Sequence, residues 1–184
     1  ERKPFMTLRV LTVRQPWAWS LIEGGKDVEN RSRNIAGSYR GPVAIHAGLA
    51  RFEDDGLWPV RKAIKSLDLG YEASDSQVWA ADHVESTDPR FIYGAIIGVA
   101  DLVSVHRSRS RGEYGISCFS DELNSWGSVC SEWAEDVSWH LMFTNSRRLE
   151  TPIPYKGALG IRCLPDEVEA RVLAGLQPVT HTGM

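Results

Sequence analysis

Lys26 and Glu29, an ammonium and a carboxylate three residues apart, are the pair of side chains with the clearest capacity for chemistry. Both belong to the extended segment 26–32, in which Asp27, Glu29 and Arg31 alternate with uncharged side chains as they do in a strand. A carboxylate can activate water as a general base. Two opposite charges can equally form an ion pair that shapes a cleft or positions a ligand. The sequence leaves both roles open for this pair.

A second group of side chains is suited to holding a nucleobase, which proteins bind by stacking and by hydrogen bonds to its edge. Aromatic rings supply the stacking, and amides can both donate and accept at a base edge. Guanidinium groups can bind phosphates with two parallel hydrogen bonds. The candidate binding residues are Gln15, Trp17, Asn30, Arg31, Arg33, Tyr39, Arg40, His46, Trp139 and Asn145.

Structural roles compete with each of these assignments. Trp17 shares a helix face with Leu21, which favours core packing. The amides can cap helices or close turns, although glutamine is a poor cap, which favours a functional role for Gln15. The arginines can pair with neighbouring acids or keep the surface soluble. A lone histidine on a strand, such as His46, is more often a hydrogen-bonded core group than an acid or base.

The three cysteines, Cys118, Cys130 and Cys163, are few and odd in number, which indicates a reducing cytoplasm rather than a disulfide framework. Cys118 and Cys130 could bind zinc together with His140. The close Cys-x-x-Cys pairing of structural zinc sites is missing, however, so buried thiols are the preferred interpretation. The sequence has no Walker, Gly-x-Ser-x-Gly or His-Glu-x-x-His pattern either, and we expect neither a cofactor nor a metal.

The elements that must position these residues are short strands and a few helices. Residues 8–14 predict a strand, and Pro16 with the glycines at 24 and 25 brackets a short helix directly after it. Further strands are expected at 43–46, 93–106, 138–144 and 158–164, with helices at 47–69 and 166–176. Many short strands without a βαβ rhythm indicate an α+β fold built on a mixed β-barrel, with peripheral helices.

The bulk properties indicate one soluble domain, which we place at residues 8–176. Residues 107–131, rich in Ser, Gly, Arg and Glu, predict a surface insertion, and residues 1–7 and 177–184 predict flexible ends. No apolar run is long enough for a membrane span. The net charge is −3, but residues 1–65 hold 12 Lys and Arg against 7 Asp and Glu, whereas residues 66–184 hold 9 against 17. The basic half permits a phosphate-facing surface.

Four segments in order resemble the ASCH family, and together they span about residues 8 to 164. The opening combines residues 11–18 (LTVRQPWA) with 24–31 (GGKDVENR), and residues 39–47 (YRGPVAIHA) follow it. Residues 94–102 (GAIIGVADL) resemble the family's central strand. Its closing segment is represented by Trp139-His140, Asn145, residues 152–154 and residues 157–160.

This resemblance implies a PUA-like barrel, with the short helix after the first strand laid against it and a cleft between them. It also implies an association with RNA or modified nucleosides. Some family members are hydrolases that remove an acyl group from acylated cytidine or cleave RNA, and the lysine matching Lys26 is catalytic in the acyl-removing members. Those members have a threonine nucleophile where this chain has Glu29, so their mechanism does not transfer directly.

Three functions therefore compete. The preferred one is binding of nucleic acid, RNA rather than DNA, or of a modified nucleobase in the cleft. The alternative is a hydrolase acting on an acylated cytidine or a ribonuclease, with Lys26 and Glu29 as catalytic residues. A third is a protein-interaction domain whose contact surface is residues 107–131. Fold resemblance alone does not choose among them.

Overall fold

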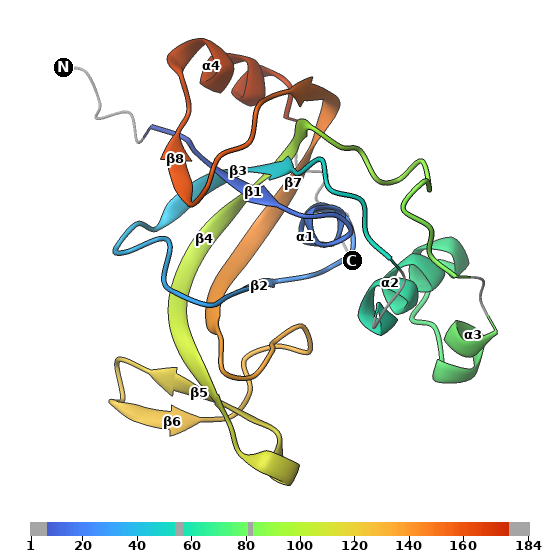
Figure 1. The fold of residues 1–184 in the computed structure, drawn as a ribbon, viewed down its shortest axis with the longest axis vertical. Helices are drawn as coiled ribbons and strands as arrows, with labels where there is room; N and C mark the ends of the chain where they lie inside the picture. Colours follow the sequence, from blue (N-terminus) through green and yellow to red (C-terminus); the bar gives the residue numbers. More distant parts are fainter. Residues whose placement is uncertain (1–6, 54–56, 81–82, 177–184) are drawn as a thin grey trace, which may run out of the picture.

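The computed structural model describes residues 7–53, 57–80 and 83–176 (Figure 1). In this part of the chain the strands are β1 (Arg9–Val13), β2 (Val28–Arg31), β3 (Gly41–Ala47), β4 (Ala95–Ser110), β5 (Ile116–Ser120), β6 (Ser125–Gly127), β7 (Trp139–Pro154) and β8 (Ile161–Cys163). The helices are α1 (Trp17–Ile22), α2 (Trp58–Leu69), α3 (Asp75–Trp79) and α4 (Asp166–Ala174), with a 3₁₀ turn η1 (Gly112–Tyr114). The mixed α+β class predicted from the sequence is confirmed.

The strands form a mostly antiparallel sheet in the order β2-β7-β4-β3-β1-β8. In addition, β5 pairs with the last residues of β4, and β6 pairs with β5. Its spine is the antiparallel pair of β4 and β7, each 16 residues long (Figure 1). Among the described strands, β1 and β3 alone pair in parallel, and the connection between them contains α1 and β2. Among the described residues no pairing joins β2 to β8, so the sheet is open and closure into a barrel stays a prediction.

The sheet has a buried cluster on each face, and successive side chains along a strand contribute to opposite clusters. Leu11 and Val13 of β1 belong to the cluster beneath α1, whereas Val10 belongs to a second cluster, under α4. In β3, Val43 and Ala44 divide in the same way. Figure 1 shows α4 at one end of the sheet and α2 with α3 to one side.

Helix α1 lies against β3, β4 and β7, and its close approach depends on a glycine in β4. A Cβ atom at Gly98 would lie 2.6 Å from the carbonyl oxygen of Arg147 and 2.8 Å from Ile22 of α1. Gly25, whose φ of 75° suits a residue without a side chain, then turns the chain out of the helix. The turn delivers Lys26 and β2 to the side of α1.

Several elements differ from the sequence prediction. The strand expected at 138–144 is β7, which continues to Pro154, and α3 was not predicted. The helix expected at 47–69 begins only at Trp58, because Gly48 donates to the carbonyl of Val13 and holds the chain beside β1. The surface insertion expected at 107–131 stays a prediction. This segment contains the end of β4 and the strands β5 and β6, which pair as a hairpin. The expected flexible ends, 1–7 and 177–184, fall outside the described residues apart from Thr7. None of the described helices has the length and apolar character that crossing a membrane requires.

Candidate functional site

Lys26 is a nearly buried cation held between two indole rings. Its side chain is 4% exposed, and Nζ lies 5.2 Å from the ring centre of Trp17 and 5.5 Å from that of Trp133. The two rings contact each other edge to face, with their centres 6.5 Å apart. Across the described ranges, no carboxylate lies within ion-pair distance of Nζ. The ammonium is therefore stabilised by aromatic faces and by more distant charges.

Burial shifts the pKa values of Lys26 and Glu29 toward one another. Desolvation lowers the pKa of Lys26 below 10.5, against the opposing charges of Glu29, Glu135 and Asp27. Desolvation raises the pKa of Glu29 above 4.5, against the nearby charges of Arg31 and Lys26. A carboxyl with a raised pKa exchanges protons more readily near neutral pH, and groups shifted in this way are common at functional sites.

Glu29 is fixed through Arg31, its neighbour on the same face of β2. Arg31 Nη2 lies 3.0 Å from Glu29 Oε1 and donates to the backbone carbonyl of Thr12 at 2.9 Å. Arg31 Nε is buried without a hydrogen-bond partner among the described residues. The guanidinium of Arg31 therefore links the Glu29 carboxylate to the backbone of β1. The pairing of an arginine with Glu29 that the sequence offered as an alternative is present.

Residues 131–135 cover Lys26, and β2 holds them in place. Asn30 Nδ2 donates to the carbonyl of Trp133 at 2.8 Å, and Asn30 Oδ1 accepts from the backbone of Glu135 at 3.1 Å. The hydroxyl of Ser131 donates to the carboxylate of Asp27. Asn30 was expected to contact a base edge, but both polar atoms of its side chain are hydrogen-bonded to this loop. Its contacts fix Trp133 over the ammonium.

Trp133 and its loop were not predicted from the sequence. They lie 103 residues beyond Asn30, and no local pattern marks them. The two rings that flank Lys26 each line a surface cavity. Trp17 lines one of about 430 Å³ that also includes Arg14 and Arg51. Trp133 lines another, of about 600 Å³, beside Trp58 of α2.

Two predicted binding residues, Gln15 and His46, are buried and have structural partners. Gln15 is buried, and its amide donates to the carbonyl of Ile92 and accepts from the backbone N–H of Trp19 in the first turn of α1. The amide group therefore caps α1 rather than being available to a base. His46 is also buried, with Nδ1 3.2 Å from the Thr12 hydroxyl and Nε2 2.9 Å from a backbone carbonyl. Burial lowers the pKa of His46, which favours a neutral ring.

The remaining candidates lie outside the Lys26 region. Tyr39 donates to the carbonyl of Pro42, and the guanidinium of Arg9 covers its ring. Asn145 lies within β7 where the register with β4 shifts, adopts a φ of 51° and donates to Asp101 Oδ2. Arg33 and Arg40 are exposed on the loop between β2 and β3, and Trp139 is half-buried opposite Arg31. The structure thus gathers Trp17, Lys26, Glu29, Asn30 and Arg31, with Trp139 across the sheet from Arg31, and leaves the other candidates apart.

The cysteines interpreted from the sequence as buried thiols belong to a cluster separate from the Lys26 region. Cys118, Cys130 and His140 are brought together with His106, which the sequence did not suggest. Burial and the neighbouring Cys118 raise the pKa of the Cys130 thiol to about 12. Burial also lowers the pKa values of both histidines. Histidine and cysteine are the side chains that could hold a transition metal here.

Comparison with known proteins gives a structural resemblance only. No protein-family model and no curated protein matches the sequence. The fold is similar to the crystal structure of ASCH from Zymomonas mobilis, with a TM-score of 0.45 and 11% identity over 93% of this chain and 96% of that chain. It is also similar to the ZmASCH S128A mutant protein from Zymomonas mobilis, with a TM-score of 0.44 and 12% identity over 93% and 97%. Both bear the name of the family that the sequence motifs resemble.

Proposed function

We propose that the chain is a PUA-like domain that binds a nucleobase of single-stranded RNA, or a modified nucleoside, beside Lys26. The observation that carries the proposal is the nearly buried Lys26 ammonium, which has two aromatic neighbours and no carboxylate at ion-pair distance among the described residues. Burying an ammonium is costly unless it is paired. A ligand with acceptor atoms, such as a base carbonyl or a phosphate, would complete its hydrogen bonds.

The surroundings of Lys26 supply the other interactions that a base requires. Trp17 and Trp133 provide aromatic surfaces, and stacking on such a ring contributes about 1–3 kcal/mol per base. Arg14, exposed at the start of α1, and Arg51 line the cavity that borders Trp17 and could bind adjacent phosphates. The aromatic rings select for a flat base, and the arginines for a charged backbone.

Binding is tested by fluorescence anisotropy with short labelled oligonucleotides of one sequence, as single-stranded RNA, single-stranded DNA and RNA duplex. We expect single-stranded RNA to bind best. Lys26→Met keeps the length of the side chain and removes its charge. Since a hydrogen bond to a charged group contributes about 1.5–3 kcal/mol, the Lys26→Met substitution should weaken binding about tenfold or more. Lys65→Met, on α2, is the matched control. Equal affinities for wild type and Lys26→Met would remove Lys26 from the binding site.

A hydrolase is the second candidate, because the pKa values of Lys26 and Glu29 are displaced in opposite directions. Glu29 would accept a proton from water as the water attacks the acyl carbon or the phosphorus, and Lys26 would stabilise the developing negative charge. The C–N or P–O bond would then break, and the proton would pass from Glu29 to the leaving amine or ribose oxygen. Turnover of acylated cytidine and of labelled RNA is measured for wild type and for Glu29→Gln. Activity in the wild type that falls by at least a hundredfold in Glu29→Gln supports catalysis. Binding without turnover leaves the first proposal alone.

A further inference from the structure

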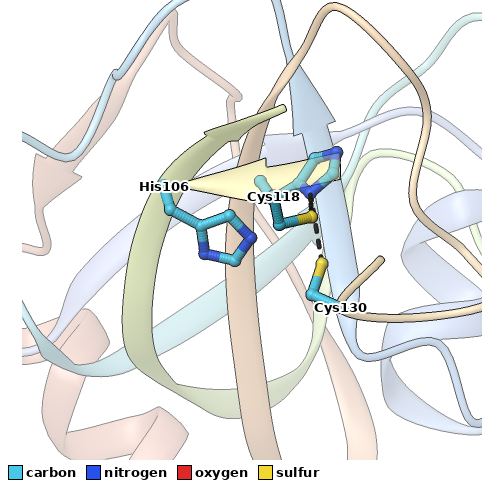
Figure 2. Close-up of side chains that lie close together, drawn as sticks. His106, Cys118 and Cys130 are labelled. Carbon is cyan, nitrogen blue, oxygen red and sulfur yellow. Dashed lines mark hydrogen bonds between the residues drawn. The ribbon is translucent and has the colours of Figure 1, made fainter. Parts of the chain in front are cut away.

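Four side chains with metal-binding atoms converge on one point at the junction of the β4–β7 spine and the β5–β6 hairpin (Figure 2). One ligand atom from each lies within 4.8 Å of those of the other three. The four residues are His106, Cys118, Cys130 and His140. Cys118 and His140 are buried, whereas His106 and Cys130 are half-buried. A cluster of this composition differs from exposed acidic groups, because thiol and imidazole ligands favour transition metals.

The sheet brings these residues together from distant parts of the chain. His106 on β4 and His140 on β7 are direct cross-strand partners, so their rings project to the same side. Cys118 lies on β5 opposite Ser108, two residues beyond His106 on β4. Cys130 follows β6, and in Figure 2 its sulfur points toward that of Cys118. Intervals of 11, 11 and 9 residues separate the four positions, unlike a sequence-local zinc motif.

The hydrogen bonds orient the cluster for a ligand. His140 Nε2 lies 2.7 Å from the carbonyl of Glu135, which requires the proton on Nε2 and leaves the Nδ1 lone pair directed at the sulfurs. Nδ1 is 3.5 Å from Cys118 Sγ and 3.2 Å from Cys130 Sγ. His106 Nε2 is buried and has no hydrogen-bond partner in the described part of the chain. Figure 2 shows the ring of His106 turned toward the two cysteines.

We propose that His106, Cys118, Cys130 and His140 bind a single zinc ion as a closed, tetrahedral structural site. With Zn–S bonds of about 2.3 Å and Zn–N bonds of about 2.05 Å, a tetrahedral site separates sulfur from nitrogen by about 3.6 Å. The distance from His140 Nδ1 to Cys118 Sγ, 3.5 Å, agrees with this value, and the distance to Cys130 Sγ, 3.2 Å, would have to lengthen slightly on metal binding. Binding Zn²⁺ displaces one proton from each thiol to solvent, and the two thiolates neutralise the ion. The backbone carbonyl of Glu135 holds His140 as an outer partner, as is usual for zinc-bound histidine.

The site would tie the loop over Lys26 to the sheet. Cys130 immediately precedes Ser131, whose hydroxyl contacts Asp27, and Glu135 provides the carbonyl that orients His140. The segment that carries Trp133 therefore has a metal ligand at one end and an outer partner at the other. Zinc would fix this segment and the β5–β6 hairpin, independently of what binds at Lys26. This assignment replaces the expectation of no metal and does not depend on the proposed nucleic-acid function.

The first test measures metal content and cobalt spectra of the intact chain. Protein purified without chelator should contain one zinc per chain by mass spectrometry of the elements. After removal of the metal, one equivalent of Co²⁺ should produce the intense visible bands of tetrahedral cobalt and a thiolate-to-cobalt charge-transfer band. Less than a tenth of an equivalent of zinc together with no thiolate band would overturn the proposal. A Cys118–Cys130 disulfide in protein isolated without oxygen would also overturn it.

Variants then assign the ligands. Cys118→Ser and Cys130→Ser should each weaken zinc binding at least a hundredfold in competition with a chromophoric chelator. Cys163→Ser, at the exposed cysteine of β8, should bind as the wild type does. If the two cysteine variants do not fold, His106→Gln decides, because it alters a half-buried ring and leaves both thiols. Wild-type zinc affinity in His106→Gln, or in either folded cysteine variant, would contradict the assignment.

Discussion

Replacing Trp133 by alanine removes an aromatic surface over Lys26 while leaving the loop that carries it anchored. The anchors use backbone atoms, since Asn30 binds the carbonyl of residue 133 and Ser131 Oγ accepts from its amide at 3.0 Å. The indole is half-buried, so we expect a stability loss of about 1–2 kcal/mol, below the 3–5 kcal/mol of a fully buried tryptophan. Binding of single-stranded RNA should weaken about 5- to 150-fold, corresponding to about 1–3 kcal/mol of stacking.

Anisotropy titrations at constant salt measure this change, with thermal unfolding to confirm that the variant is folded. Trp126→Ala is the matched control, because that ring is also half-buried but lies on β6 and packs on Phe119. Trp133→Phe should recover part of the affinity, since it restores a smaller stacking surface. Affinity within twofold of the wild type in a folded Trp133→Ala would refute the reasoning that a base stacks there.

The charges and packing around α1 provide three further tests by chemical unfolding. Because the pKa of Lys26 is lowered in the folded state, its buried charge destabilises the fold below the folded pKa and no longer does so above 10.5. Lys26→Met should therefore increase the free energy of unfolding at neutral pH, and this increase should shrink as the pH approaches 10.5. The raised pKa of Glu29 makes the folded state hold the extra proton; stability should fall as the pH rises from 4.5 through the folded pKa, and Glu29→Gln should lose that slope. Gly98→Ala, with its Cβ 2.6 Å from the Arg147 carbonyl, should lose about 1–3 kcal/mol, whereas Gly127→Ala, with open space around it, should lose little. An unchanged pH slope in Glu29→Gln, or equal losses at the two glycines, would contradict these assignments.

Local signals predicted the segment from β1 to β2 well. Pro16 and the paired glycines mark the limits of α1, and the expected strand at 8–14 is β1. Lys26 and Glu29 lie close together because only two residues separate them. These features depend on neighbours in the chain, and such neighbours are visible in a sequence. The burial of Lys26 is not visible there, because it requires Trp133 from a distant loop.

Long-range contacts account for what the sequence missed. Trp133 reaches Lys26 only because β2 pairs with β7 and Asn30 binds the loop before it. His106 meets His140 only through the register of β4 and β7, which bulges shift along their length. Gln15 illustrates the opposite case, since its amide does cap α1 although glutamine caps are rare. Register and side-chain partners across a sheet are set by the whole fold rather than by local pattern.

NMR titration with short single-stranded RNA and with free nucleosides tests the central proposal most directly. The indole NH signals of Trp17 and Trp133 and the amides from Gly25 to Asn30 report on the Lys26 region, and the exposed loop bearing Arg33 and Arg40 serves as an internal control. We predict saturable shifts at the two indoles and at Lys26. Shifts confined to the arginine loop, or none at millimolar ligand, would contradict the proposal that a base binds beside Lys26.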